Sequence, residues 1–257
     1  MATTLDEVKR EVAIANRVLA EVGLATGAMA SLGHTSMRVP SQPDTFVVKG
    51  RGYEIDALAL MRPEDMVVCD LEGFKVDGPP GSTQCREVKM HSCIYKLRPD
   101  VQSVTHVHPR YVVVMSVLQA ALVPMCQEGI QLVRKPLPVY PHVKTVWSDE
   151  EGMDVAKQLG DNRAIILQGH GASTAGRSLD ESVMNMLLLE EQAKMNWYAY
   201  CAAGPNHPRI SDEMIDEMTN RTNVRDLPHF KAAIDENTPR LEGGVWDYYT
   251  WKVSRDL

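Results

Sequence analysis

Three histidines and a glutamate carry the strongest chemical signal in the sequence. His106 and His108 lie two residues apart in Ser-Val-Thr-His-Val-His-Pro, downstream of Glu87, and His170 follows in Gln-Gly-His-Gly. Side chains two apart on a β-strand point to the same face, so both imidazoles of the first pair would be presented to one point. Three imidazoles and one carboxylate form a divalent-metal site with room for a substrate.

Ordinary burial is the alternative for each of these histidines, because imidazole also serves as a hydrogen-bonding group in protein cores. Glycines on both sides of His170 favour the metal interpretation, since they remove side chains that would crowd an approaching ligand. We expect one divalent ion per subunit, zinc or manganese, with iron and cobalt also compatible with this ligand set.

The apolar periodicity indicates the elements that must position these residues. Helices are expected at 5–22, 87–97, 110–119, 149–159 and 179–203, and strands at 31–39, 46–48, 66–70, 73–76, 137–140, 164–168 and around the two neighbouring histidines. A mobile loop is expected at 78–81. The first connections are too short for crossovers, so the fold class is α/β (α+β), with a central, mostly antiparallel sheet flanked by helices.

Composition limits the classes of partner. The chain has 257 residues, 44% hydrophobic and 24% charged, which suits a single catalytic domain at 1–205 followed by a tail at 206–257. A net charge of -7 argues against nucleic-acid and membrane-surface partners. No apolar run reaches the roughly 20 residues needed to span a bilayer. With no such run, and no basic-then-apolar pattern at the N-terminus, we expect a cytoplasmic location. The five cysteines include no Cys-x-x-Cys pair, so we expect reduced thiols.

The tail differs from the rest of the chain. It is polar and interrupted by prolines, and it ends in the aromatic cluster 246–251. An aromatic terminal arm of this kind is expected to pack either on its own domain or on a neighbouring subunit, and both alternatives stay open.

An ordered set of motifs across about residues 5–205 resembles the class II aldolase/adducin superfamily. The motifs are Gly33-His-Thr-Ser36, Arg86-Glu87, Arg98-Pro-Asp-Val101, His106-Val-His-Pro109 and Gln168-Gly-His-Gly171. The resemblance implies a three-layer fold around an antiparallel sheet and a fourfold homotetramer with active sites at subunit interfaces. It also implies that His106, His108 and His170 bind the metal, and that Glu87 binds metal or moves protons.

Departures from the family pattern point away from sugar phosphates. The sugar-phosphate aldolases and epimerases of the family hold phosphate with an asparagine and small hydroxyl residues, where this chain has His34, Lys49-Gly-Arg-Gly52 and Cys85-Arg86. The aldolases also use a tyrosine where this chain has Cys126-Gln-Glu-Gly129. Arg51 and Arg86 instead offer guanidinium groups suited to carboxylates. Ion pairing at a surface or interface is the alternative for both arginines.

The same positions are similar to those of family members that decarboxylate hydroxylated aromatic or pyridine dicarboxylic acids. The resemblance implies a metal-dependent carbon–carbon lyase of aromatic compound catabolism, in which an enolate or phenolate holds the electrons that departing CO2 leaves behind. Its small-molecule carboxylate substrate would be bound by Arg51, Arg86, Lys49 and Ser36. The catalytic residues would be Glu87, His34 and Glu128.

Three other functions compete with this one. An aldolase acting on an unphosphorylated hydroxy-keto acid would use the same metal and release an aldehyde instead of CO2, and a mononuclear iron oxygenase would consume O2. A non-catalytic, adducin-like association module would need no convergent ligands, so the presence of all three histidines and Glu87 counts against it. His91, four residues after Glu87, is a proton relay or a core residue, and the core interpretation is favoured.

Overall fold

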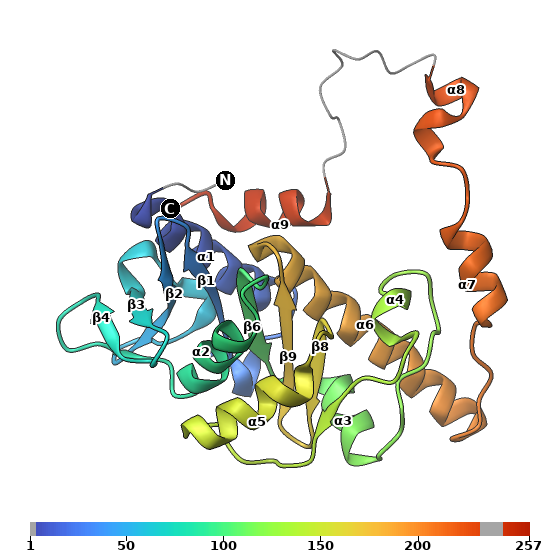
Figure 1. Ribbon diagram of the computed structural model, residues 1–257, viewed down its shortest axis with the longest axis horizontal. Helices are drawn as coiled ribbons and strands as arrows, with labels where there is room; N and C mark the ends of the chain where they lie inside the picture. The colour runs from blue at the N-terminus through green and yellow to red at the C-terminus, as the bar shows by residue number, and fades with distance from the viewer. Residues whose placement is uncertain (1–3, 232–243) are drawn as a thin grey trace.

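A mixed sheet forms the centre of the protein (Figure 1). The computed structural model describes residues 4–231 and 244–257. The strands are β1 (His34–Val39), β2 (Gln42–Arg51), β3 (Met66–Asp70), β4 (Lys75–Asp77), β5 (Thr83–Gln84), β6 (Ser103–Val107), β7 (Val139–Tyr140), β8 (Ala164–Leu167) and β9 (Gly171–Gly176). Their order is β4-β3-β2-β1-β6-β9-β8-β7, with β5 paired to β2. Every pairing between these strands except β7 with β8 is antiparallel, so the mostly antiparallel sheet is confirmed.

Helices cover both faces of the sheet and make a three-layer structure (Figure 1). The described helices are α1 (Leu5–Glu21), α2 (Val88–Leu97), α3 (Arg110–Val117), α4 (Ile130–Val133), α5 (Asp149–Leu159), α6 (Leu179–Ala203), α7 (Asp212–Thr219), α8 (Pro228–Lys231) and α9 (Val245–Val253). One core cluster joins the sheet to α2 and α5, and two others join it to α1, α3 and α6.

Strand alternation explains how one sheet supplies two cores. On β2, Phe46 and Val48 pack with α2, whereas Val47 between them packs with α1. The same period of two on β6 sends Val104 toward α2 and Val107 toward the opposite core. Residues of β6 that share the parity of Val104 therefore face α2.

Several elements differ from the sequence-based prediction. β9 and the short elements β5 and α4 were not predicted, because none of them shows a clear alternation of apolar and polar residues. β6 ends at Val107, so His108 lies just beyond the strand and not within it. Glu87 is the N-cap of α2 instead of a residue inside the helix. The turn at 78–81 follows β4, and its expected mobility stays a prediction.

The described parts of the tail contact the chain's own domain, among other places through α7 and through the end of α9. Arg134 forms ion pairs with Asp212 and Asp216 and so holds α7 beside α4. The Arg17 side chain of α1 binds the carbonyl oxygen of Val253 at 3.1 Å and the carboxylate of Asp256. Figure 1 shows α7 and α8 to one side of the sheet and α9 above α1. The segment 232–243 lies outside the described residues, and the boundary at 205 stays a prediction.

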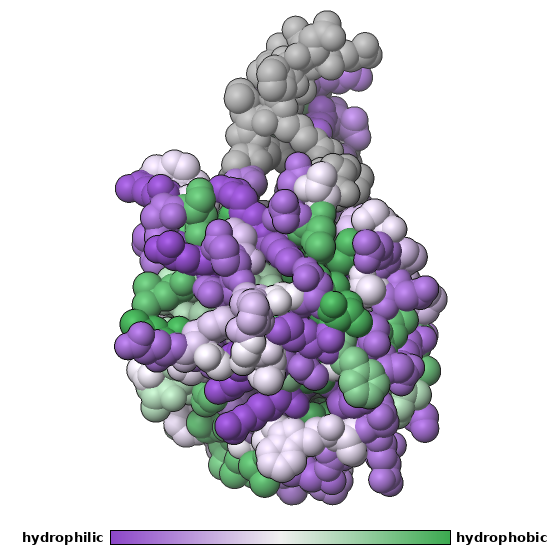
Figure 2. All heavy atoms as spheres, turned by 90° about the vertical axis from the view of Figure 1, so that its left-hand side faces the viewer, coloured by the Kyte–Doolittle hydropathy of each residue, from purple (hydrophilic) through white to green (hydrophobic). Residues whose placement is uncertain are grey.

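The face of the molecule at the β4 end carries mainly hydrophilic side chains with separate hydrophobic spots (Figure 2). None of the helices in residues 4–231 and 244–257 combines the length and the hydropathy that crossing a membrane requires.

Candidate metal centre and active site

Neighbouring strands bring the first site residues together at one end of the sheet. His106 on β6 lies directly opposite His34 on β1 and Ser173 on β9. All three belong to the face that carries α2, because His106 shares the parity of Val104. The His34 and His106 rings are 5.3 Å apart, centroid to centroid.

His108 and His170 join His106 from the chain segments that follow β6 and precede β9. The ring centroids of the three histidines are 4.7 to 5.2 Å apart. Gly171 makes this approach possible. A Cβ atom at that position would clash with the Val107 carbonyl oxygen and would lie 3.1 Å from His108 Cδ2 and 3.3 Å from His106 Cε1. A side chain at 171 would therefore push the histidines apart.

Glu87 contributes its carboxylate from the start of α2. Its Oε2 lies 3.2 Å from His106 Nε2, and its Oε1 lies 3.6 Å from His170 Nε2. The backbone N–H of Val146 donates to Oε1 at 3.2 Å, which holds the carboxylate in place. His34 Nε2 stands farther off, 3.8 Å from Oε2.

The donor atoms of these residues fit a divalent metal ion. Ligand atoms of Glu87, His106, His108 and His170 all lie within 4.8 Å of one another. The hydroxyl of Ser173 donates to the Met90 sulfur at 2.7 Å, so its oxygen accepts a hydrogen bond from His106 Nδ1 at 3.2 Å. His106 Nε2 then carries a lone pair, and this nitrogen is buried without a hydrogen-bond partner in the described structure. A neutral imidazole whose second ring nitrogen is held by a hydrogen bond, as Ser173 holds Nδ1 of His106, is a typical metal ligand.

Ser173→Ala is therefore expected to lower metal affinity about 10- to 100-fold, since it removes the group that orients His106. Calorimetric zinc titration of the metal-free protein would measure the change. Ser103→Ala is the matched control. Like Ser173, Ser103 is a buried strand serine, but it lies in β6 and its hydroxyl binds Ser182 and the Ser36 carbonyl oxygen. Equal zinc affinity in the Ser173 variant and the wild type would contradict this role.

Burial keeps His34, His108 and His170 uncharged at neutral pH. Burial lowers the pKa of His34 to about 4 and that of His108 to about 3, and it also lowers the pKa of His170. Burial raises the pKa of Glu87, but the neighbouring His106 and His34 outweigh that effect and lower it well below its usual range. Neutral imidazoles beside an ionised carboxylate are the protonation states that metal binding requires.

The lowered pKa of His34 predicts a loss of stability in acid. The unfolded chain protonates this histidine below about pH 6.5, whereas the folded protein does so only near pH 4, so the unfolded state binds more protons between these values. The titration of His34 should therefore lower the free energy of unfolding of the metal-free protein by about 1.6 kcal/mol between pH 6.5 and pH 5. Urea denaturation at both pH values would measure it. His34→Gln should show a correspondingly smaller fall, and equal falls in both proteins would refute the assignment.

A second hydrogen-bonded group lies behind His34. Its Nδ1 is 2.6 Å from His91 Nε2, and His91 Nδ1 is 2.7 Å from the hydroxyl of Ser36. The Ser36 oxygen is also 2.7 Å from the hydroxyl of Tyr95. His91 and Ser36 are fully buried. The Ser36 hydroxyl is thus engaged inside the core, and the structure does not bring it to a substrate.

The predicted carboxylate-binding residues have different surroundings. Lys49 is buried, and its ammonium group pairs with Asp56 at 2.5 Å. Arg51 pairs with the second oxygen of Asp56 at 3.3 Å, so the ion-pair alternative holds for this arginine in the isolated chain. Arg86 is exposed next to Glu87. Of the predicted substrate-binding residues, Arg86 is the one next to a candidate metal ligand in the sequence, because it immediately precedes Glu87.

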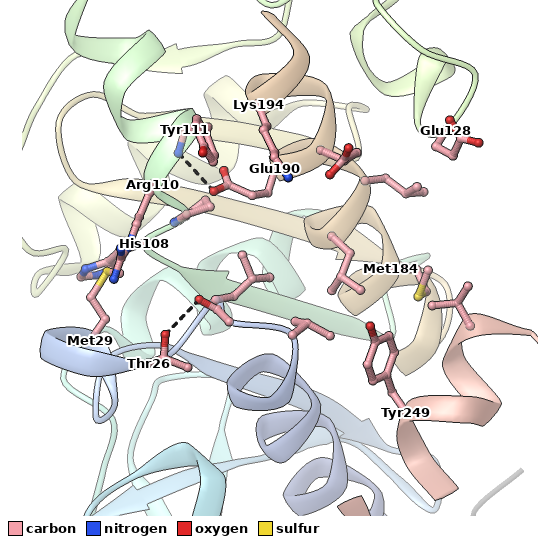
Figure 3. Close-up of a pocket in the computed structure, with 18 residues that line it drawn as sticks. Thr26, Met29, His108, Arg110, Tyr111, Glu128, Met184, Glu190, Lys194 and Tyr249 are labelled. Carbon is pink, nitrogen blue, oxygen red and sulfur yellow. Dashed lines mark hydrogen bonds between the residues drawn. The ribbon is translucent and has the colours of Figure 1, made fainter. Parts of the chain in front are cut away.

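A cavity of about 530 Å³ adjoins His108, one of the candidate metal ligands (Figure 3). His108 lines one end of it, and Tyr249 of α9 lines another part. Glu190 also lines the cavity and accepts hydrogen bonds from the backbone N–H groups of Tyr111 and Val112. Figure 3 shows Glu128 on the far side of the cavity from His108, so a single chain does not bring Glu128 to the metal ligands.

The sequence reasoning missed Ser173 and Val146. Ser173 lies in the run Gly171–Gly176, whose small residues carry no pattern that marks a strand or a site. Val146 acts through its backbone N–H, which the identity of a residue does not reveal. A strand predicted after His170 would have placed Ser173 opposite His106.

Comparisons with known proteins agree with this fold. Residues 10–197 match the family described as Class II Aldolase and Adducin N-terminal domain, and the chain belongs to this family. A 3,4-dihydroxyphthalate decarboxylase from Rhodococcus jostii (strain RHA1) is 29% identical over 211 residues, which cover 79% of this chain and 84% of the relative.

Solved structures show the same fold. An aldolase II superfamily protein from Pseudomonas syringae superposes with a TM-score of 0.77 at 21% identity and covers 99% of this chain and 95% of that one. The L-fuculose 1-phosphate aldolase from Glaciozyma antarctica PI12 gives a TM-score of 0.74 at 22% identity, with 99% and 92% covered. The expected class II aldolase-like fold is confirmed.

Proposed function

We propose that this protein is a metal-dependent carboxy-lyase acting on a hydroxylated aromatic or pyridine carboxylic acid, with a dicarboxylic acid as the preferred substrate. The observation that carries the proposal is the convergence of three histidines and one carboxylate beside His34, with one of the histidines, His108, lining a cavity. The decarboxylase from Rhodococcus jostii supports CO2 as the leaving group, because it matches most of the chain.

The metal is one divalent ion per subunit, held by His106, His108, His170 and Glu87. When bound, such an ion acts as a Lewis acid and stabilises negative charge on an oxygen of the substrate. Zinc and manganese are the first candidates, followed by iron and cobalt.

The reaction breaks the bond between a ring carbon and a carboxylate carbon. CO2 leaves, the electron pair of that bond stays on the ring, and a proton must then be added to the ring carbon. Two groups can carry this proton to the ring carbon. The ionised Glu87 carboxylate must first take up a proton, from solvent or from the substrate hydroxyl, and His34 Nε2 lies 3.8 Å from Glu87 Oε2. Arg86, Arg51 and Lys49 are proposed to hold the carboxylate groups of the substrate.

The direct test is CO2 release from a panel of ortho-hydroxy aromatic and pyridine carboxylates, each as a mono- and a dicarboxylate. Purified protein is stripped with a chelator and reloaded separately with zinc, manganese and iron(II). Metal-dependent CO2 release with no aldehyde product would support the proposal. Release of an aldehyde from a hydroxy-keto acid, with no CO2 from the panel, would replace it with the aldolase function, and substrate-dependent O2 consumption would indicate an oxygenase.

Arg86→Ala is expected to raise KM for a dicarboxylate about 10- to 100-fold and to change kcat little, because a guanidinium–carboxylate contact contributes mainly to substrate binding. Steady-state kinetics on the substrate found in the panel would measure both constants. Arg10→Ala, at an exposed position of α1, is the control. An unchanged KM would remove Arg86 from the substrate site.

The proposed assembly is a homo-oligomer, with a tetramer as the first candidate and active sites at subunit interfaces. In this arrangement Glu128 would act from a neighbouring subunit, because within one chain it lies across the cavity from His108. The adducin-like alternative is weakened by the four convergent donor atoms, which an association module does not need.

A further inference from the structure

A continuous row of hydrogen bonds runs from the core to His34. It begins at the Tyr95 hydroxyl on α2, passes through Ser36 on β1 and His91 on α2, and ends at His34 Nδ1. We propose that Tyr95, Ser36 and His91 are positioning residues that fix the orientation and tautomer of His34, so that its Nε2 carries the proton and faces Glu87. The consequence for catalysis rests on the proposed function, whereas the tautomer itself does not.

The Tyr95 hydroxyl decides which atom donates in each hydrogen bond between Tyr95 and His91. The Tyr95 hydroxyl is buried, and the Ser36 oxygen is the side-chain partner found for it in the described structure. A buried O–H without an acceptor costs more free energy than an oxygen that lacks a second donor, so Tyr95 donates to Ser36. The Ser36 hydroxyl then donates to His91 Nδ1, which must be unprotonated.

The protonated nitrogen of His34 follows from the chemistry of imidazole. A neutral histidine carries one ring proton, so His91 with an unprotonated Nδ1 is protonated at Nε2. This N–H donates to His34 Nδ1 across 2.6 Å, a distance at which only one of the two facing nitrogens can hold a proton. His34 is consequently protonated at Nε2, the nitrogen 3.8 Å from the Glu87 carboxylate.

Packing keeps the row from rearranging. Phe46 lies nearly parallel to the His91 ring, with centroids 6.4 Å apart and an interplanar angle of 13°. Arg38 lies over the Tyr95 ring at 4.6 Å and also donates to the Tyr95 carbonyl oxygen. Because His91 has no exposed surface, its ring cannot flip without opening the core.

A second metal site is the competing explanation for this group. Ligand atoms of His34, Cys85 and His91 lie within 4.8 Å of one another. Two imidazole nitrogens bound to one tetrahedral zinc ion would be about 3.3 Å apart, given zinc–nitrogen distances of about 2.0 Å. The facing nitrogens of His34 and His91 are closer than that and are directed at each other, as in a hydrogen bond.

The first experiment reads the tautomer without turnover. Protein labelled with 15N-histidine and loaded with zinc would be studied by long-range proton–nitrogen correlation, with His34 assigned from the loss of its signals in His34→Gln. We expect His34 Nδ1 to be unprotonated and hydrogen-bonded and its Nε2 to be protonated. A proton on Nδ1 would overturn the proposal, as would two zinc ions per subunit with loss of the bond between the two rings.

The second experiment uses a matched pair of variants. His91→Phe keeps a ring of similar size but removes the donor to His34, whereas His91→Gln retains an amide N–H that can replace it. We expect kcat to fall at least 10-fold in His91→Phe with KM within about 2-fold of wild type, and most of the loss to be recovered in His91→Gln. The Nδ1 signal of His34 should move to the position of a free lone pair only in His91→Phe.

The outcomes separate this inference from the proposed function. If no tested compound is decarboxylated, the nitrogen spectrum of the wild type still decides the tautomer. If decarboxylation is found but His91→Phe retains wild-type kcat, the function stands and the positioning role falls. Ser36→Ala gives a further check, because a substrate-binding serine would raise KM, whereas a positioning serine leaves KM unchanged.

Discussion

Replacing His108 with alanine is expected to abolish metal binding and to lower kcat/KM by at least about 1,000-fold. The variant loses one of the three imidazoles whose rings are 4.7 to 5.2 Å apart, and the remaining donors no longer surround an ion. Metal content after dialysis, measured by elemental analysis, and CO2 release with the substrate found in the panel would test both parts.

The control for this variant is His207→Ala. His207 follows α6, belongs to neither the candidate ligand set nor the cavity lining, and contacts the carbonyl oxygen of Pro208. Its replacement should leave metal content and turnover unchanged. The His108 variant should remain folded, because His108 lies just after β6 and belongs to none of the core clusters. Full activity in the His108 variant would remove this residue from the metal site.

Glu87→Gln is the second change with a large expected effect. The amide oxygen can still accept the Val146 N–H, but the negative charge beside the histidines is lost. We expect kcat to fall at least about 100-fold at saturating metal, because a positioned group that transfers protons contributes about 10²- to 10⁴-fold. Metal affinity should also fall, since a neutral amide is a weaker ligand than a carboxylate.

Saturating metal separates the two roles of Glu87. If added zinc or manganese restores wild-type kcat, Glu87 only binds metal, and its assignment as a proton-transfer group is wrong. Glu217→Gln is the matched control, because Glu217 is an exposed carboxylate on α7. It should leave both kcat and metal affinity unchanged.

The sequence predicted the long, strongly periodic elements well. Helices α5 and α6 begin and end where they were expected, because Ser148 and Ser178 cap their first turns and Gly160 and Gly204 follow their last residues. β9 was missed even though it lies in the middle of the sheet. Its residues are small or hydroxylated, and their burial depends on β6, β8 and α6, which local pattern does not reveal.

The candidate site, too, was predictable from the sequence only in part. The motifs identified His106, His108, His170 and Glu87 in advance, and the structure brings the four together. Ser36 was expected to bind substrate, but the structure places its hydroxyl between His91 and Tyr95. The parity of a residue on a strand is visible in the sequence, whereas the element that covers that face is not.

The sequence by itself determined the chemical groups that this protein can use: imidazoles and a carboxylate suited to a divalent ion, and basic residues suited to a carboxylate. Only the tertiary structure decided which nitrogen of each histidine is available. His106 Nε2 is free because Ser173 binds Nδ1, and His34 Nε2 faces Glu87 because His91 binds the other nitrogen. The physical reason is that ligand identity is local in the chain, whereas orientation and protonation depend on buried hydrogen bonds between distant segments.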